Sequence, residues 1–186
     1  MYFEAYIRFK HHPLGQVHMP ESASQVLYTP AQRARRDATA WTLVQGVLAP
    51  VQFLIFGISL YLVVNSLQTS EHTDWALASV VLKTVVLYTI MVTGAIWEKV
   101  VFDCYLFAPA FFWEDVVSMG VMALHTAYVW VWWQEAWSAT DQLLLALAAY
   151  GSYAINAAQY IRKLRMARLQ KTETLSLPDT GAQAST

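Results

Sequence analysis

Four long apolar segments, joined by short polar connections, dominate the chain. They cover residues 41–67, 75–97, 113–133 and 143–161. The first and the fourth contain no charged residue, and the second contains only Lys83. A helix needs about 20 mainly apolar residues to cross a bilayer. The pattern therefore predicts an all-α, polytopic membrane protein with four transmembrane helices.

The positively charged residues predict how these helices are oriented. Three arginines lie within 33–36, before the first segment, and five Lys or Arg residues lie within 162–171, after the fourth. The connections 68–74 and 134–141 contain neither Lys nor Arg. Cytoplasmic segments are enriched in these residues, so both termini are predicted to be cytoplasmic. Tryptophans near the segment ends fit an aromatic belt at the membrane surface: Trp41, Trp75, Trp97, Trp113, Trp130, Trp132, Trp133 and Trp137.

Composition supports the membrane assignment and excludes other classes of protein. Apolar residues make up 56 % of the 186 residues, and charged residues only 13 %, about half the share usual in a soluble domain. A net charge of −1 gives no general attraction to nucleic acid. The single cysteine, Cys104, cannot form a disulfide within the chain.

The segment boundaries predict three regions. Residues 1–28 are turn-rich and are predicted to be a flexible N-terminal extension. Thr29 followed by Pro30 is typical of a helix start, so the four-helix transmembrane domain is predicted to cover residues 29–170. The polar residues 171–186 are predicted to be a disordered tail.

Candidate chemistry is concentrated between the second and third apolar segments. The stretch 97–115 contains four carboxylates and one lysine among many aromatic residues. A carboxyl group that is buried in apolar surroundings retains its proton and can act as a general acid. The alternative is a solvated loop at the membrane surface, in which Glu98 and Lys99 flank a helix end.

Helical spacing places several polar residues of the third segment on one stripe. At 100° per residue, Glu114, Ser118, His125 and Tyr128 face the same way, and a polar stripe in a membrane helix faces the bundle interior. His125 would lie about 16 Å along the helix from Glu114. Two interpretations of His125 stay open: a hydrogen bond to a neighbouring helix, or axial ligation of a pigment's central metal.

The other segments carry fewer polar positions. In the first, Gln45, Gln52 and Ser59 recur every seven residues and can hydrogen-bond across helices. In the second, Lys83 either extends outward to the membrane surface or pairs with a substrate carboxylate. Tyr153, Asn156 and Tyr160 share one side of the fourth segment.

Five stretches of the chain resemble one protein family, the 3-vinyl bacteriochlorophyllide hydratases, which are small membrane proteins of bacteriochlorophyll biosynthesis. They are RRDATAWTLVQGVLAPVQFLIF (35–56), YTIMVTGAIWEKVVF (88–102), YLFAPAFFWEDVVSM (105–119), ALHTAY (123–128) and INAAQY (155–160). The run YLFAPAFFWED beside IWEK is the most specific part. The resemblance covers residues 29 to 170.

This resemblance implies a hydro-lyase reaction in the bacterial cytoplasmic membrane. Water and the 3-vinyl group of chlorophyllide a, or of the matching bacteriochlorophyllide, would give a 3-(1-hydroxyethyl) group. The reaction requires no redox cofactor. The implied partners are the pigment substrate, membrane lipid and other enzymes of bacteriochlorophyll biosynthesis, with no nucleic acid.

We assign candidate roles by matching this chemistry to the residues. Glu114 is the preferred general acid because it shares a stripe with His125, and Asp115 or Glu98 would orient or activate water. The candidate substrate-binding residues are His125, Trp113, Tyr128, Gln52 and Lys83. No metal belongs to the protein itself in this interpretation, since His125 would ligate the magnesium of the substrate.

Two alternative functions follow from the same residues. The first is a non-catalytic membrane carrier of tetrapyrroles or a photosystem assembly factor, which would tolerate replacement of Glu114. The second is a small transporter or channel. The second and fourth segments have few polar positions and the chain has no internal repeat, so a transporter fits the sequence poorly.

Overall fold

The computed structural model describes residues 27–135 and 137–176 of the chain, and within them every regular element is an α-helix. The all-α prediction is confirmed. The helices are α2 (Pro30–Ala38), α3 (Ala40–Thr69), α4 (Thr73–Phe102), α5 (Phe112–Gln134) and α6 (Ala139–Ser176). The helix α6 therefore extends into the segment 171–186, and residues 177–186 lie outside the described part.

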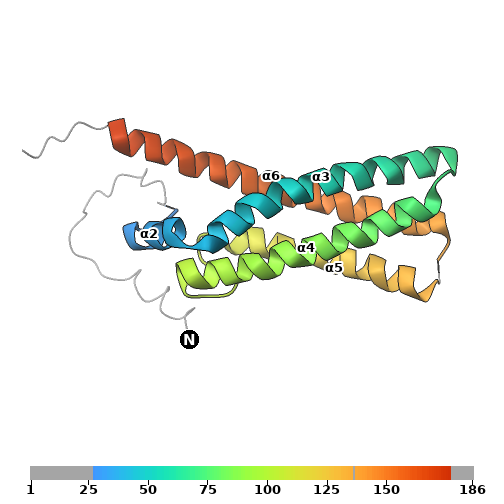
Figure 1. Cartoon of the computed structure of the whole chain (residues 1–186), viewed down its shortest axis with the longest axis horizontal. Coiled ribbons are helices and arrows are strands. Elements are labelled where there is room, and N and C mark those ends of the chain that lie inside the picture. Colours follow the sequence, from blue (N-terminus) through green and yellow to red (C-terminus); the bar gives the residue numbers. More distant parts are fainter. Residues whose placement is uncertain (1–26, 136, 177–186) are drawn as a thin grey trace, which may run out of the picture.

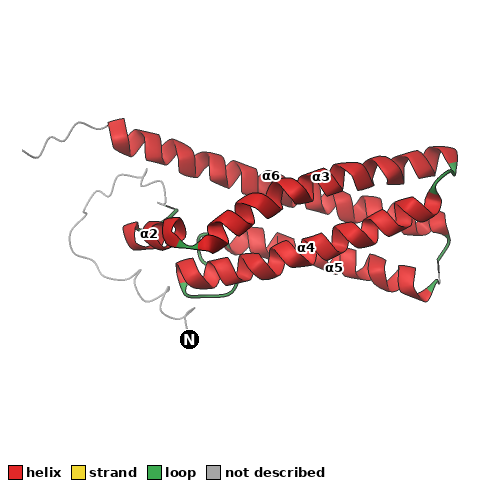
Figure 2. Ribbon diagram, viewed as in Figure 1, coloured by secondary structure: helices red, strands yellow, loops and turns green. Residues whose placement is uncertain are grey.

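The four long helices form an antiparallel bundle (Figures 1 and 2). The helix α3 packs along α4, and α5 packs along α6; α3 also contacts α6, and α4 contacts both α5 and α6. The short helix α2 lies against α4. One end of the bundle, called here the α2 end, gathers α2, the start of α3, the end of α4 and the start of α5 (Figure 1). At this end α6 continues beyond its neighbours.

Three of these helices are long and apolar enough to cross a membrane. Their mean hydropathies are 2.3 for α3, 1.9 for α4 and 1.3 for α5, and much of their apolar surface faces outward. Leu54, Val85 and Val92 are each more than half exposed, which suits contact with lipid and not with water. The fourth predicted segment lies in α6, where the apolar turns run on into basic turns beginning at Arg162.

The predicted start of the first helix is confirmed. Thr29 caps α2: its hydroxyl accepts a hydrogen bond from the Gln32 backbone N–H at 3.2 Å, and the Gln32 side chain accepts one from the Thr29 N–H at 2.9 Å. Just before this cap, Tyr28 is buried and stacks on Phe102 at 5.7 Å between ring centroids. This contact holds the start of α2 against the end of α4.

Polar side chains of α3 link the helices, as the seven-residue spacing predicts. The Gln45 amide donates to Thr93 at 2.8 Å, and the Ser59 hydroxyl bonds Ser79 at 2.6 Å and Tyr150 at 2.5 Å. Hydrogen bonds of this kind between membrane helices contribute about 0.6 kcal/mol each. They fix the relative positions of α3, α4 and α6.

Candidate active site

The end of α4 and the start of α5 are joined by a loop, residues 103–111, which is anchored at its first residue. Asp103 ends α4 with φ 66°, and its carbonyl accepts a hydrogen bond from Lys99 Nζ at 2.8 Å. Its carboxylate binds the Arg35 guanidinium of α2 at 2.6 Å. This hydrogen bond and the charge of Arg35 hold the pKa of Asp103 below its ordinary value. The salt bridge ties α2 to the loop.

Two carboxyl groups meet beneath this loop, and we call Glu98 and Asp115 the carboxyl pair. Glu98 is 5 % exposed and Asp115 is 1 % exposed. Loop backbone covers both: the Phe107 N–H donates to Asp115 Oδ2 at 2.8 Å, and the Ala108 N–H donates to Glu98 Oε2 at 3.3 Å. The two side chains lie close enough to act on each other electrostatically. Ionised carboxylates only accept hydrogen bonds, so the two can share a hydrogen bond only when one of them carries a proton.

The surroundings favour negative charge on Asp115 and the proton on Glu98. Asp115 accepts hydrogen bonds from Phe107 N–H and from the Tyr160 hydroxyl, the latter at 3.3 Å. Asp115 also lies in the first turn of α5, where the helix dipole stabilises a negative charge. Glu98 lies near the C-terminal end of α4, where the dipole disfavours one. The pair is therefore polarised, with a proton donor beside a proton acceptor.

An aromatic cluster adjoins the pair through Tyr160, whose hydroxyl donates to Asp115. The Phe111 ring stacks on Tyr160 at 6.3 Å and packs edge-on against Trp97 and Phe102, each at 5.7 Å. Behind Asp115, the Asn156 amide donates to the Ser118 hydroxyl at 2.9 Å. The surroundings of Asp115 therefore combine an aromatic cluster with polar side chains of α5 and α6.

Glu114 lies outside the pair, although it was the preferred acid in the sequence analysis. Its carboxylate forms a salt bridge with Lys163 Nζ of α6 at 2.6 Å, with side-chain exposures of 12 % for Glu114 and 24 % for Lys163. The buried stripe of α5 contains Asp115, Ser118, Val121, His125 and Tyr128. The predicted stripe is thus correct from Ser118 onward, but Asp115 replaces Glu114 at its start.

His125 and Lys83 lie deep in the bundle, away from the carboxyl pair. Both are fully buried, so the alternative in which Lys83 extends outward is wrong. The Lys83 Nζ lies 3.6 Å from the centroid of the Tyr153 ring. Ten residues of α5 separate His125 from Asp115, about 15 Å, and fifteen residues of α4 separate Lys83 from Glu98, about 22 Å.

The remaining substrate-binding candidates are also dispersed. Tyr128 is buried and its hydroxyl donates to the Leu77 carbonyl at 3.0 Å. Gln52 is buried beside Tyr153. Trp113 is 71 % exposed on the outer surface of α5. The structure therefore brings together Glu98 and Asp115 among the predicted site residues, with Glu114 at their edge.

His125 has a defined tautomer. Its Nδ1 lies 2.8 Å from the Val121 carbonyl oxygen, which can only accept a hydrogen bond, so the proton is on Nδ1. The Nε2 atom is buried without a hydrogen-bond partner among the described residues. A neutral imidazole with Nδ1 bonded to a backbone carbonyl is the form that ligates metals.

Sequence reasoning missed two members of the site. Tyr160 was noted only as one polar position on the fourth segment. It is the last residue of INAAQY (155–160), one of the stretches that resemble the family, and this could have marked it as a site residue. The N–H of Phe107 could not be found from the sequence, because a backbone donor has no residue-type signature. Its position depends on φ 60° at Phe107, a conformation that is rare for a side chain with a Cβ.

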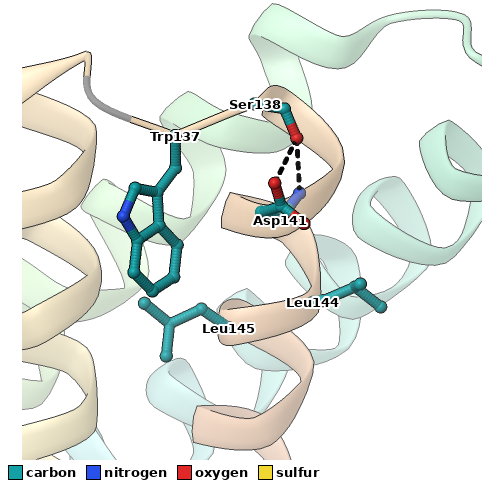
Figure 3. Close-up of a pocket in the computed structure, with 5 residues that line it drawn as sticks. All are labelled: Trp137, Ser138, Asp141, Leu144 and Leu145. Carbon is teal, nitrogen blue, oxygen red and sulfur yellow. Dashed lines mark hydrogen bonds between the residues drawn. The ribbon is translucent and has the colours of Figure 1, made fainter.

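A hollow of about 540 Å³ at the opposite end of the bundle has a structural role (Figure 3). It is lined by Trp137, Ser138, Asp141, Leu144 and Leu145. The Ser138 hydroxyl donates to Asp141 Oδ2 at 2.6 Å and accepts from the Asp141 N–H at 3.2 Å. These groups cap the start of α6. Among the described residues, no cluster of three His, Cys, Asp or Glu side chains could hold a metal ion.

Comparison with known proteins identifies close relatives over most of the chain. The family described as 2-vinyl bacteriochlorophyllide hydratase matches residues 28–166. A 2-vinyl bacteriochlorophyllide hydratase of Rhodobacter capsulatus is 61 % identical over 152 residues, which cover 81 % of this chain and 88 % of that protein. One of Cereibacter sphaeroides is 63 % identical over 150 residues, covering 81 % of this chain and 93 % of that protein. No solved structure matches the chain.

Proposed function

The chain belongs to the 2-vinyl bacteriochlorophyllide hydratase family, and on this premise we propose that the carboxyl pair transfers the protons of vinyl hydration. The chain is a hydro-lyase of bacteriochlorophyll biosynthesis, and it adds water to the vinyl group of a bacteriochlorophyllide-type substrate. The position numbers 2 and 3 denote the same vinyl group in two numbering schemes of the macrocycle. The observation that carries the proposal is the burial of Glu98 and Asp115 together beneath the loop, whose successive N–H groups donate to them.

The reaction requires one proton donor and one proton acceptor. The π electrons of the vinyl group take a proton at the terminal carbon, and the positive charge on the inner carbon is delocalised into the macrocycle. The oxygen of water then bonds to the inner carbon and loses a proton to a base. The net change is the addition of one water, with no oxidation or reduction.

The polarised carboxyl pair supplies both groups. Glu98, which carries the proton, donates it to the vinyl carbon, and Asp115, which carries the charge, accepts the proton of water. After the reaction the proton is on Asp115 and the charge on Glu98. A hydrogen bond between the two side chains returns the proton in one step, because the helix dipoles and the donors to Asp115 favour the starting arrangement.

We also propose a membrane topology for this site. The segment 143–161 of α6 is the fourth span, and the α2 end, which carries the arginines of α2 and the basic residues after 161, faces the cytoplasm. The membrane is the bacterial inner membrane. The antiparallel order of α3 to α6 and the outward-facing apolar side chains support this topology. The carboxyl pair then lies near the cytoplasmic surface of the membrane, where water is available as the second substrate.

The roles of the deeper residues stay predictions. His125 keeps the tautomer that a magnesium ligand needs, and Lys83 and Gln52 lie buried around Tyr153 on the neighbouring helices. His125 lies about 15 Å along α5 from Asp115, and Lys83 lies about 22 Å along α4 from Glu98. Any role that these residues have in binding the substrate is therefore distinct from the proton transfer.

The test uses membranes that contain the full chain, chlorophyllide a and no added redox cofactor. The expected product is heavier by one water. Glu98→Gln and Asp115→Asn are each expected to lower the rate by about 10²–10⁴-fold, while pigment binding is retained. Glu114→Gln is the matched control, because it neutralises an adjacent carboxylate outside the pair.

Three outcomes would contradict the proposal. Full turnover by both pair variants would show that other groups transfer the protons. Loss of turnover in Glu114→Gln alone would make Glu114 the acid. Pigment binding by the unmodified chain without any mass change would favour a carrier in place of a hydratase.

A further inference from the structure

Four aromatic side chains form an exposed surface next to the carboxyl pair, and we call it the outer aromatic face. It consists of Tyr105, Phe107, Phe112 and Trp113, which are 62 %, 43 %, 44 % and 71 % exposed. The Phe112 ring contacts Phe107 at 5.8 Å and Trp113 at 5.4 Å between centroids. These rings, with interplanar angles of 53° and 85° between neighbours, present an apolar aromatic surface at the α2 end of the bundle.

The outer aromatic face is separated from the carboxyl pair by a single stretch of backbone. Phe107 contributes its ring to the face, and its own N–H donates to Asp115 Oδ2 at 2.8 Å. The next residue, Ala108, is buried and donates its N–H to Glu98. A group that displaces this stretch by a small amount therefore reaches both carboxyl groups. The positive φ of Phe107 shows that the loop is held in a conformation that costs energy here.

An exposed cation borders the same face. Lys99 Nζ lies 5.7 Å from the Tyr105 ring centroid, and within the described part of the chain it donates one hydrogen bond, to the Asp103 carbonyl. An ammonium group has three donors. The Asp103 carboxylate nearby is engaged by Arg35, so Lys99 has donors left for an external anion.

We propose that the outer aromatic face is the docking site for the substrate macrocycle and that Lys99 binds its carboxylate side chain. The proposal rests on the proposed function, since it takes the substrate to be a bacteriochlorophyllide-type tetrapyrrole. An ending in "-ide" denotes the free acid, so the substrate combines a flat apolar ring with one carboxylate. The face offers the matching combination of flat apolar rings and one cation.

Other cations are less suitable for this carboxylate. Lys163 is already paired with Glu114. Lys83 is enclosed in the bundle about 22 Å along α4 from Glu98, too far to bind the carboxylate while the vinyl group is at the pair. Lys99 directly follows Glu98 in the chain, so a substrate bound to it stays beside the reacting groups.

The far end of the bundle provides an internal control. Trp75 and Trp133 are 71 % and 74 % exposed there, but the connections 68–74 and 134–141 contain no Lys or Arg. An ordinary aromatic belt anchors a protein in the membrane at both ends. A docking face, in contrast, should matter for the substrate only at the α2 end.

The experiment compares the free acid of the magnesium tetrapyrrole with its methyl ester, using the full chain in lipid nanodiscs. Binding is followed by pigment fluorescence, and hydration is followed separately by mass. Lys99→Gln is expected to raise the Kd of the free acid about fivefold and to leave the Kd of the ester unchanged. Trp113→Ala is expected to raise the Kd of both about tenfold. Arg162→Gln, which removes an exposed cation of α6, and Trp133→Ala, which removes an exposed ring at the far end, are expected to change neither.

Three results would overturn the docking site. The first is an equal effect of Lys99→Gln on acid and ester. The second is an equal effect of Trp113→Ala and Trp133→Ala. A loss of binding in His125→Leu that disappears when the pigment lacks magnesium would also overturn it, because the macrocycle would then lie inside the bundle. These results are read from Kd, whereas the carboxyl pair is tested by turnover, so either proposal can fail alone.

Discussion

Glu114 and Asp115 are neighbours in the chain, yet their side chains bind different parts of the molecule. Glu114 forms a salt bridge with Lys163 of α6, whereas Asp115 accepts hydrogen bonds from the Phe107 N–H of the loop and from Tyr160. A helix turns by 100° per residue, which is enough to separate a carboxylate at the edge of the bundle from one in its interior. Glu114 is therefore placed to hold α5 against α6, and Asp115 is placed to react.

Replacing Lys163 with Met should therefore destabilise the bundle without removing its chemistry. The change leaves a mostly buried Glu114 carboxylate without its partner, which we expect to cost about 2 kcal/mol, between the values for exposed and buried pairs. The measurement is the unfolding midpoint of the detergent-solubilised protein. The reversed pair, Glu114→Lys with Lys163→Glu, should recover part of this loss and retain hydration. A stable reversed pair without any turnover would instead assign the acid to Glu114.

Tyr160 is expected to position the charge of Asp115. Tyr160→Phe removes one hydroxyl donor and keeps the ring stacked on Phe111. A hydrogen bond to a charged group contributes about 1.5–3 kcal/mol, so kcat should fall about tenfold or more while KM stays constant. Tyr153→Phe is the control, since it removes a buried hydroxyl of the same helix that does not contact the pair. Equal effects of the two changes would indicate a general packing role.

Local features of this fold were predictable from the sequence, and contacts between distant segments were not. The cap at Thr29 follows from two adjacent residues, Thr29 and Pro30, and the α3 to α5 spans follow from apolar runs. The pairing of Glu98 with Asp115 depends on how the loop 103–111 folds back. The pairing of Lys163 with Glu114 joins residues 49 positions apart.

The error at the start of the α5 stripe has a specific physical cause. The angular position of Glu114 is compatible with the stripe of Ser118 and His125, and periodicity alone cannot separate it from Asp115. The basic residues after 161 were interpreted only as topology determinants. One of them, Lys163, returns to the bundle and draws Glu114 to its edge.

The salt bridge between Arg35 and Asp103 is expected to hold α2 on the loop. Arg35→Gln should speed hydrogen exchange of the α2 amides, measured by mass spectrometry, because α2 contributes no buried side chain of its own. Arg35 lowers the pKa of Asp103, so the contribution should be present above the ordinary pKa of Asp and lost as the pH falls through the lowered value. Salt should weaken it, since both groups are substantially exposed. If Arg35→Gln left the hydrogen exchange of the α2 amides unchanged, the contacts of Tyr28 would be sufficient to hold α2 in place.

Cys104, the sole cysteine, provides a chemical probe of the docking face. Burial raises the pKa of its thiol, and the nearby Glu98 and Asp115 carboxyl groups raise it further. Because the thiolate is the reactive form, we expect alkylation at pH 7.5 to be slower than that of a free thiol. The rate should rise about tenfold per pH unit until it passes the raised pKa.

Bound substrate should slow this alkylation, because Cys104 lies between Asp103 and Tyr105 in the loop beside the face. The free acid is expected to protect more strongly than the methyl ester, and Lys99→Gln should abolish the difference. The measurement is the rate of mass increase with iodoacetamide, with Cys104→Ser as the unlabelled control. Absence of protection by both would separate the loop from the substrate, and equal protection by acid and ester would show that Lys99 does not bind the carboxylate. Stronger protection by the free acid than by the methyl ester would place the substrate carboxylate beside Lys99, independently of any effect on turnover.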